Sequence, residues 1–153
     1  MKKKPLLIVA GEPYSIFSEL FLKIYHKKIK KIKIPIILIV SEKLFFRQMK
    51  KLGYSYKINK IGIKDVLKKK IDNKKINIID IKFKFKKTFD KISYKSNKYI
   101  ENSFDTALKL LKNKKAIGLI NGPISKKHFL NSKFLGITEY LSSKTKSKNN
   151  QKI

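Results

Sequence analysis

The chain has 153 residues, enough for one domain with its own core, and 39 Lys and Arg residues against 10 Asp and Glu give a formal charge of +29. Only Arg47 is an arginine, and this argues against a specific nucleic-acid reader, because bidentate base contacts and stacking favour arginine over lysine. The absence of cysteine excludes a disulfide framework and a thiolate metal site, and it fits a cytoplasmic protein.

The lysine excess has two interpretations. A surface of this charge suits RNA or another anionic surface. Lysine, isoleucine, asparagine and phenylalanine are all abundant, however, and all have codons rich in A and T, so drift in base composition also explains the charge. We favour drift and keep a lysine-rich, non-catalytic module that binds RNA or anionic surfaces as the alternative function.

The chain opens with a predicted strand and a predicted helix. "PLLIVA", residues 5–10, is a continuous apolar run of the kind found in strands buried on both faces. It is too short for a signal peptide, and no apolar stretch reaches the length of a membrane span, so we expect no membrane partner. Residues 16–27 have helical spacing, with Ile16, Leu20 and Ile24 recurring at four-residue intervals and aromatic residues beside them.

The next segments repeat this order. "IPIILIV", residues 34–40, is a second buried strand. Ser41 is a suitable N-cap for a helix carrying Phe45 and Met49 on one face, and Gly53 fits the position just after its end. "YSYKI", residues 54–58, is predicted as a third strand.

The middle of the chain changes from an alternating pattern to a helical one. Residues 81–86 alternate apolar residues with lysine, which predicts a half-exposed or edge strand. Residues 96–114 form the best helix of the chain, and Ser96 or Asn97 can cap it. Its apolar stripe consists of Ile100, Phe104, Ala107, Leu108 and Leu111.

A last strand, "AIGLI" at residues 116–120, is ended by Asn-Gly-Pro. Short apolar strands that alternate with helices predict an α/β fold, a mostly parallel sheet with flanking helices. We expect residues 1–141 to form this α/β domain and residues 142–153, rich in lysine and poor in large apolar residues, to be a disordered tail.

Two loops fall where parallel α/β sheets bind ligands, at the carboxyl ends of strands: "AGEPYS" at 10–15 and "NGPISKKH" at 121–128. A helix start favours anions; Ser125 can cap such a helix and Lys126 can add a charge for a phosphate or carboxylate. The alternative is that Gly-Pro only makes a turn and Ser125 only caps.

Few other residues suggest chemistry. Glu12 suits an acid/base group or a hydrogen-bond acceptor, or it only complements a helix dipole. His26 is expected at the surface, and a lone His128 is more often structural or exposed than a metal ligand. Two histidines without cysteine give no local metal cluster, and no glycine-rich nucleotide motif is present.

Three motifs carry a resemblance to a known family. "GEPYSIFSE" at 11–19, "GPISK" at 122–126 and "GITE" at 136–139 follow one another as in the amino-terminal half of 4-hydroxythreonine-4-phosphate dehydrogenase. The resemblance spans nearly the whole chain. It implies part of an isopropylmalate dehydrogenase-like fold and a homodimer with an active site between domains.

The resemblance also implies the reaction. NAD or NADP oxidises the secondary alcohol of 4-phosphonooxy-L-threonine in pyridoxal phosphate biosynthesis, and the β-keto acid then loses carbon dioxide. A divalent metal (Zn, Mg or Co) polarises the reacting oxygen in the full-length family. The residues expected to contact the phosphorylated amino acid are Thr138, Lys126, Asn121 and Glu12; no catalytic or cofactor-binding residue is assigned.

The sequence departs from the family pattern at three points. Tyr14 and Phe17 replace small residues of the first loop, and Ile137, which cannot hydrogen bond, stands where the family has histidine. Family members are also about twice as long, and their metal-binding histidines lie in the other half. We therefore expect a truncated chain that is inactive alone, or one that pairs with a separately encoded second half.

Overall fold

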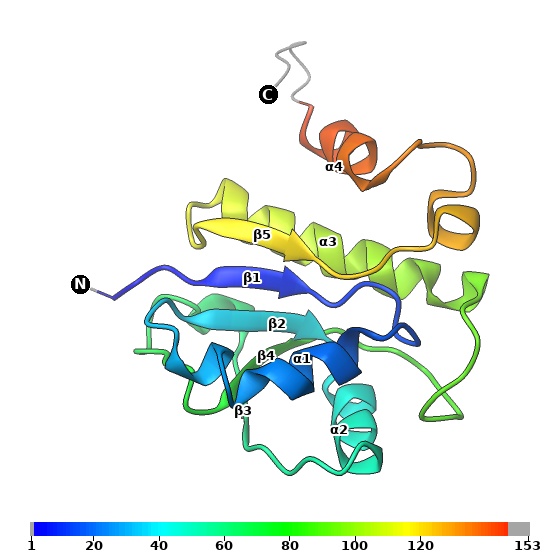
Figure 1. The fold of residues 1–153 in the computed structure, drawn as a ribbon. Helices are drawn as coiled ribbons and strands as arrows, with labels where there is room; N and C mark the ends of the chain where they lie inside the picture. Colours follow the sequence, from blue (N-terminus) through cyan, green and yellow to red (C-terminus); the bar gives the residue numbers. More distant parts are fainter. Residues whose placement is uncertain (1, 147–153) are drawn as a thin grey trace.

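Five parallel strands form one sheet, in the order β3-β4-β2-β1-β5. The computed structural model describes residues 2–146. The strands are β1 (Leu6–Val9), β2 (Ile36–Val40), β3 (Ile58–Lys60), β4 (Ile76–Asp80) and β5 (Gly118–Asn121). All five carboxyl ends therefore lie along the same side of the sheet, where Figure 1 shows the arrowheads of β1, β2 and β5.

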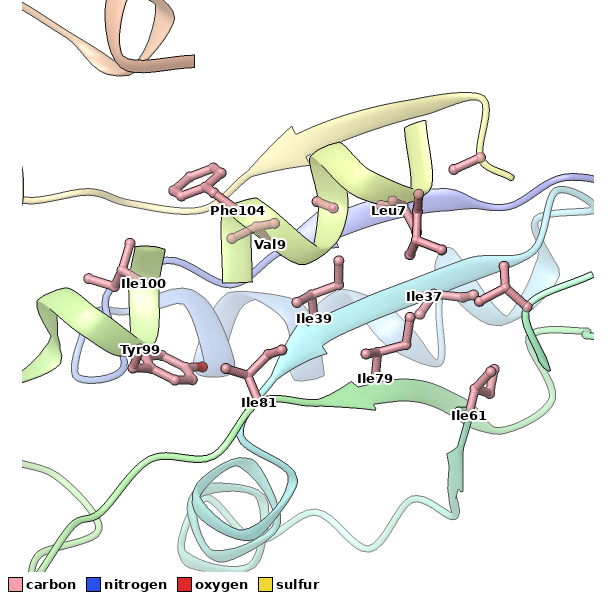
Figure 2. Packing of buried hydrophobic residues seen from close by; sticks show 14 of the residues in the cluster. Leu7, Val9, Ile37, Ile39, Ile61, Ile79, Ile81, Tyr99, Ile100 and Phe104 are labelled. Carbon is pink, nitrogen blue, oxygen red and sulfur yellow. The ribbon is translucent and has the colours of Figure 1, made fainter. Parts of the chain in front are cut away.

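Helices cover both faces of the sheet. The helices are α1 (Phe17–Tyr25), α2 (Glu42–Lys51), α3 (Asn97–Lys112) and α4 (Ile137–Thr145). α3 lies behind the sheet in Figure 1, and α1 lies in front of it. Figure 2 shows Tyr99, Ile100 and Phe104 of α3 facing strand residues such as Val9 and Ile39. None of the helices within residues 2–146 is long and apolar enough to cross a membrane.

The predicted strands at residues 5–10, 34–40 and 116–120 are confirmed as β1, β2 and β5, and the first two are buried as predicted. The prediction that the third is buried is wrong, because the residues of β5 are half-buried or exposed. In β2 every side chain is buried, since α1 and α2 cover one face and α3 the other. The predicted cap of α2 is also correct: the Ser41 side chain accepts a hydrogen bond from the Leu44 N–H at 3.4 Å. Gly53 follows this helix with φ +82°.

The predicted helix at 16–27 is confirmed as α1, but the residues of the four-residue pattern do not pack in the core. Its buried face consists of Ser18, Phe21, Leu22 and Tyr25. By contrast, Ile16, Leu20 and Ile24 are 61%, 50% and 49% exposed. Because apolar residues surround most of this helix, periodicity alone did not show which face meets the sheet.

The predicted edge strand at 81–86 is wrong. The strand is β4, five residues earlier, and it lies inside the sheet between β3 and β2. Its run "INII" is fully buried, whereas residues 82–86 continue beyond the end of the sheet and have no strand to pair with in the described part of the chain. The third strand is likewise shifted: β3 begins at Ile58, where the predicted segment 54–58 ends.

The helix at 96–114 is confirmed as α3, with Ile100, Phe104 and Ala107 buried. Predicted disorder from residue 142 is wrong for residues 142–145, which complete α4. Lys144 ties this turn to α3 through Glu101 (3.1 Å) and Asp105 (3.5 Å). Residues 147–153 of the predicted tail lie outside the described residues.

Candidate functional site

The loops after β1 and β5 touch at the carboxyl side of the sheet, and two glycines make this possible. A Cβ atom on Gly122 would lie 2.1 Å from the Ala10 carbonyl oxygen, and one on Gly11 would lie 2.4 Å from that of Pro123. Gly11 also has φ +80°, a left-handed conformation that favours glycine. The backbone N–H of Glu12 donates to the Pro123 oxygen at 2.9 Å, which locks the two loops together.

Glu12 joins these loops to the start of α3. Its side chain is only 2% exposed. One carboxylate oxygen accepts a hydrogen bond from the Ser96 hydroxyl (3.1 Å), and the other accepts one from the Ser125 N–H (3.2 Å). Burial raises the pKa of the Glu12 carboxyl, although the bonds from Ser125 and Ser96 and the nearby His128 act in the opposite direction. We call Glu12, Ser96 and Ser125 the Glu12 clasp.

Ser125 begins a short π-helical turn, Lys126–Leu130, and caps it as predicted. Its hydroxyl accepts a hydrogen bond from the His128 N–H at 3.0 Å and lies 3.0 Å from His128 Nδ1. Asn97 of α3 donates to the His128 carbonyl oxygen at 2.8 Å, and the Tyr94 ring packs edge-on against the imidazole. His128 therefore has a structural place in the described chain, as its isolation in the sequence indicated.

Three of the four predicted substrate contacts are exposed. Asn121 ends β5, Lys126 opens the π-turn and Thr138 lies in the first turn of α4. Within residues 2–146 no hydrogen bond joins any of these side chains to another; Asn121 donates only to the neighbouring Gly122 carbonyl. Glu12 differs, because both of its oxygens already have protein partners. The structure thus brings Glu12 and the Lys126 loop together and presents the other side chains outward.

The side chain of Tyr140 packs α4 against the rest of the domain. This residue is 7% exposed, and its ring packs edge-to-face on Phe104, Phe129 and Phe134 at 5.7, 5.0 and 5.5 Å between centroids. Between the π-turn and α4, Asn131 and Ser132 both have left-handed φ values of 46° and 59°. This double turn redirects the chain and gives α4 a fixed position from which Thr138 is exposed.

Sequence reasoning missed a polar cluster at the end of β4. Asp80 accepts a hydrogen bond from the Glu42 N–H at 2.9 Å, and it lies 2.8 Å from Lys82 Nζ and 3.7 Å from Lys60 Nζ. Burial opposes ionisation of Asp80, but these donors and charges outweigh it and hold its pKa below the usual value. An aspartate that closes an apolar run, as in "INIID", was the available signal.

Two cavities of about 400 Å³ flank the start of α3. One lies beside Ser96 and is lined largely by aromatic and lysine side chains: Tyr14, Phe83, Lys84, Phe85, Lys86, Lys91 and Lys95. The other contains Asn97 and Tyr140, whose buried side-chain oxygens have no hydrogen-bond partner within the described residues. Neither cavity was predicted: irregular segments form most of the walls of the first, and the second lies between α3, the π-turn and α4, which only the tertiary structure brings together.

The described residues do not fit a metal ion. Residues 2–146 contain no group of three or more His, Cys, Asp or Glu side chains placed to hold one. Glu12, the most buried carboxylate near the loops, uses its oxygens within the clasp. We therefore assign no chemical step to a metal bound by these residues.

Comparison with known proteins matches residues 31–153 to the family described as pyridoxal phosphate biosynthetic protein PdxA. A relative, the 4-hydroxythreonine-4-phosphate dehydrogenase of Sulfurihydrogenibium sp. (strain YO3AOP1), is 34% identical over 140 residues, covering 90% of this chain and 41% of the relative. The chain thus spans less than half the length of this relative.

Solved structures share the fold. The 4-hydroxythreonine-4-phosphate dehydrogenase from Burkholderia phymatum matches with a TM-score of 0.77 and 19% identity over 94% of this chain and 44% of that one. The corresponding protein from Klebsiella pneumoniae gives 0.71 and 15% over 92% and 45%. The predicted fold class, a mostly parallel α/β sheet resembling part of the isopropylmalate dehydrogenase-like fold, is confirmed.

Proposed function

The chain belongs to the family of pyridoxal phosphate biosynthetic protein PdxA, and from this premise we propose that it supplies the substrate-binding, amino-terminal part of a 4-hydroxythreonine-4-phosphate dehydrogenase. The substrate is 4-phosphonooxy-L-threonine. Oxidation of its secondary alcohol gives a β-keto acid, which loses carbon dioxide to leave an aminoketone phosphate. NAD or NADP, when bound, accepts the hydride.

The side chains at the carboxyl side of the sheet divide this work. Lys126 attracts the phosphate or carboxylate of the substrate, and the Thr138 hydroxyl and Asn121 amide supply hydrogen bonds that orient it. Glu12 acts indirectly: its carboxylate accepts a hydrogen bond from the Ser125 N–H, which holds the Lys126 loop in place. The clasp is the observation that carries the proposal. In it, the buried carboxylate of Glu12 fixes the loop on which the side chain of Lys126 is exposed.

If this proposal is correct, turnover requires residues from the part of the full-length relatives that this chain does not match. We therefore expect the 153-residue chain alone to bind 4-phosphonooxy-L-threonine weakly and to reduce no NAD or NADP, with magnesium, zinc or cobalt added. Adding the remaining part of the Sulfurihydrogenibium relative as a separate polypeptide is expected to allow turnover. Vigorous turnover by the chain alone would contradict this division of labour.

Calorimetric titration with 4-phosphonooxy-L-threonine tests the individual contacts. We expect Thr138→Ala and Lys126→Ala each to weaken binding about tenfold, since each removes a hydrogen bond to an ionic ligand. Thr106→Ala is the matched control, because Thr106 is a helical threonine whose hydroxyl bonds to the Asn102 carbonyl in its own helix. Equal weakening by the Thr106 and Thr138 variants would remove the case for Thr138.

The homodimer, the cytoplasmic location and the choice between NAD and NADP stay predictions from the resemblance. Sedimentation of the purified chain, alone and with the second polypeptide, measures the assembly state. The two nicotinamide cofactors can be compared in the same turnover assay.

A second candidate function rests on the cavity beside Ser96. There the rings of Phe83 and Phe85 stack 6.3 Å apart, Arg47 lies 5.2 Å over the Phe85 ring, and four lysines line the wall. Aromatic platforms with cations bind single-stranded RNA without sequence preference. Filter binding of RNA at two salt concentrations tests this function. RNA binding that persists at the higher salt concentration and that Phe85→Ala weakens would support it. Loss of RNA binding at moderate salt would leave codon drift as the explanation of the positive charge.

A further inference from the structure

The segments that lead into the five strands are richer in lysine than the segments that leave the sheet. They contain 16 lysines in 33 residues and a single acidic residue, Asp72. The segments that follow β1, β4 and β5, residues 10–16, 81–96 and 122–136, contain 9 lysines in 38 residues. Codon drift would raise the lysine content of both sets alike, so drift does not account for this difference. We call the lysine-rich set the amino-end face: residues 2–5, 26–35, 52–57, 68–75 and 113–117.

Hydrogen bonds hold the amino-end face in a fixed shape. Asn73 is 4% exposed, and its side-chain N–H groups donate to the carbonyl oxygens of Ile32 and Ile34, both at 2.8 Å. Its Oδ1 accepts a hydrogen bond from the Ile36 N–H at 2.9 Å, and its backbone carbonyl accepts one from the Tyr25 hydroxyl at 2.7 Å. The loops before β2 and β4 are therefore joined. In Figure 1 this face is on the left, where the arrows of β1, β2 and β5 begin.

A cavity of about 730 Å³ opens in this face. It is lined by Lys2, Lys3, Lys33, Pro35, Lys70, Ile71 and Asp72, which precede β1, β2 and β4. Within residues 2–146, no lysine of the amino-end face forms an ion pair. The positive charge of this face is therefore available to an anionic partner.

Two exposed isoleucines stand among these lysines. Ile32 and Ile34 are 43% and 41% exposed, and they alternate with Lys31 and Lys33. Asn73 fixes the backbone of both isoleucines. Apolar side chains surrounded by lysine suit a membrane surface, where cations meet lipid phosphates and apolar groups reach the acyl chains.

We propose that the amino-end face binds the surface of a membrane rich in anionic phospholipids. Its lysines contact the lipid phosphates, and Ile32 and Ile34 enter the boundary between headgroups and acyl chains. We expected no membrane partner because no apolar run is long enough to span a membrane, but binding to its surface requires no such run. This inference goes beyond the proposed function, because Asn121 and Lys126 lie on the opposite, carboxyl side of the sheet.

RNA suits this face less well than lipid does. Single-stranded RNA uses aromatic rings on which its bases stack, in addition to cations. The rings of this region instead pack on one another, since the Tyr56 centroid lies 4.8 Å from that of Tyr25 and 5.6 Å from that of Tyr54. RNA also makes no particular use of exposed isoleucine. A second copy of the chain is disfavoured because it would bring another +29 of charge to the contact.

Sedimentation of the full chain with phospholipid vesicles tests the proposal. We expect binding to equimolar phosphatidylglycerol and phosphatidylcholine, no binding to phosphatidylcholine alone, and weaker binding as salt rises. Absence of binding to the anionic vesicles would overturn the proposal. Because any chain of this charge is attracted to anionic lipid, matched variants are needed to locate the contact.

The first pair of variants carries the same charge at different positions. The double variant Lys33→Glu, Lys70→Glu alters the amino-end face, and Lys87→Glu, Lys127→Glu alters exposed lysines on the carboxyl side. We expect the first double variant to weaken vesicle binding at least tenfold more than the second. Equal weakening would overturn the proposal, because the overall charge would then explain the binding.

The second pair tests the isoleucines. Ile34→Ser is expected to weaken vesicle binding about fivefold, because one apolar side chain no longer enters the membrane boundary. Ile63→Ser is the matched control: Ile63 is 39% exposed and follows β3 on the carboxyl side, so binding is expected to be unchanged. Equal affinity of these two variants would overturn the proposal.

Filter binding of single-stranded RNA to the same variants tests the other occupant. We expect the Lys33→Glu, Lys70→Glu variant to lose vesicle binding and to bind RNA no more weakly than the Lys87→Glu, Lys127→Glu variant does. RNA binding that only the first variant loses, with vesicle binding retained, would make RNA the occupant and overturn the proposal.

Discussion

The two edges of the sheet are stabilised by different physics. Near β5, glycines let two loops touch, and the Glu12 clasp binds them with hydrogen bonds to serines. Near β3, Asp80 forms ion pairs with Lys60 and Lys82 and accepts a hydrogen bond from the first residue of α2. The first arrangement depends on shape and burial, so salt affects it little. The second depends on ion pairs, which salt and acid weaken.

The edges also differ in what they leave open. β3 is short, with Lys57 before it and Lys60 as its last residue, so it discourages further pairing. Within residues 2–146, β5 instead presents isoleucine and an unpaired backbone edge. In a chain with so much lysine, an exposed apolar strand without lysine is informative. Among the described residues, the two edges of the sheet therefore differ in the side chains that they expose.

Gly122→Ala is expected to have the largest effect and to show how tightly the β5 side is built. The new Cβ atom would meet backbone atoms of Ala10 at 2.1 and 2.8 Å, which cannot move as a flexible side chain can. We expect a loss of about 3 kcal/mol or more of unfolding free energy, measured in urea.

Gly136→Ala is the control for this prediction. No atom lies within 4 Å of the Cβ position at Gly136, and its φ of −163° suits any residue, so we expect a loss below about 1 kcal/mol. Equal losses for the two glycines would mean that the close contact at β5 does not constrain the fold.

Glu12→Ala is next, with an expected loss of about 2 kcal/mol, because it leaves the Ser96 hydroxyl and Ser125 N–H without their acceptor. The pH dependence is measured with Glu12→Gln. Since burial raises the folded pKa above the usual 4.5, the folded state holds the proton more tightly. The stabilisation from Glu12 is thus fully present below 4.5 and is lost as pH rises through the raised pKa.

Urea unfolding of both proteins near pH 4.5 and at neutral pH therefore gives the expected sign. The stability of the natural chain relative to Glu12→Gln is greater at the lower pH. The opposite trend would show that the clasp favours the ionised carboxylate and that burial is not dominant.

Asp80→Asn tests the β3 side and is expected to cost about 1 kcal/mol at neutral pH, from the weakened contacts with the α2 start and the lysines. The pKa of Asp80 is held below its usual 3.8, so its contribution is present above that value and is lost as pH falls through the folded pKa. High salt is expected to reduce this cost but not that of Glu12→Ala. A similar salt response at both sites would remove the distinction between the two edges.

Ile120→Lys is expected to change the stability of the chain alone least, by less than about 0.5 kcal/mol, because the side chain is half exposed. Thermal unfolding of the chain alone measures this. A loss comparable to that of Gly122→Ala would show that Ile120 belongs to the core, and the β5 edge would then resemble the β3 edge.

Some of the candidate site was readable from residues alone. The Asn-Gly-Pro segment after an apolar run correctly indicated a loop at the carboxyl end of a strand, and Ser125 caps the turn as its spacing indicated. Glu12 was singled out, but its partners Ser96 and Ser125 are 84 and 113 residues away, so no local pattern could show that its oxygens are occupied. At Asp80 the aspartate that closes an apolar run was a local signal, but two of its partners, Glu42 and Lys60, lie far from it in the sequence.

The local sequence pattern determined most of the strands and helices. A continuous apolar run such as "IPIILIV" removes its side chains from water only when it is buried on both faces, as a central strand is. Tertiary structure alone decided which side of α1 is buried. It also decided that, within residues 2–146, residues 82–86 lie outside the sheet and β5 is an edge strand. These features depend on which elements become neighbours, and the free energy of that choice comes from contacts between residues far apart in the chain.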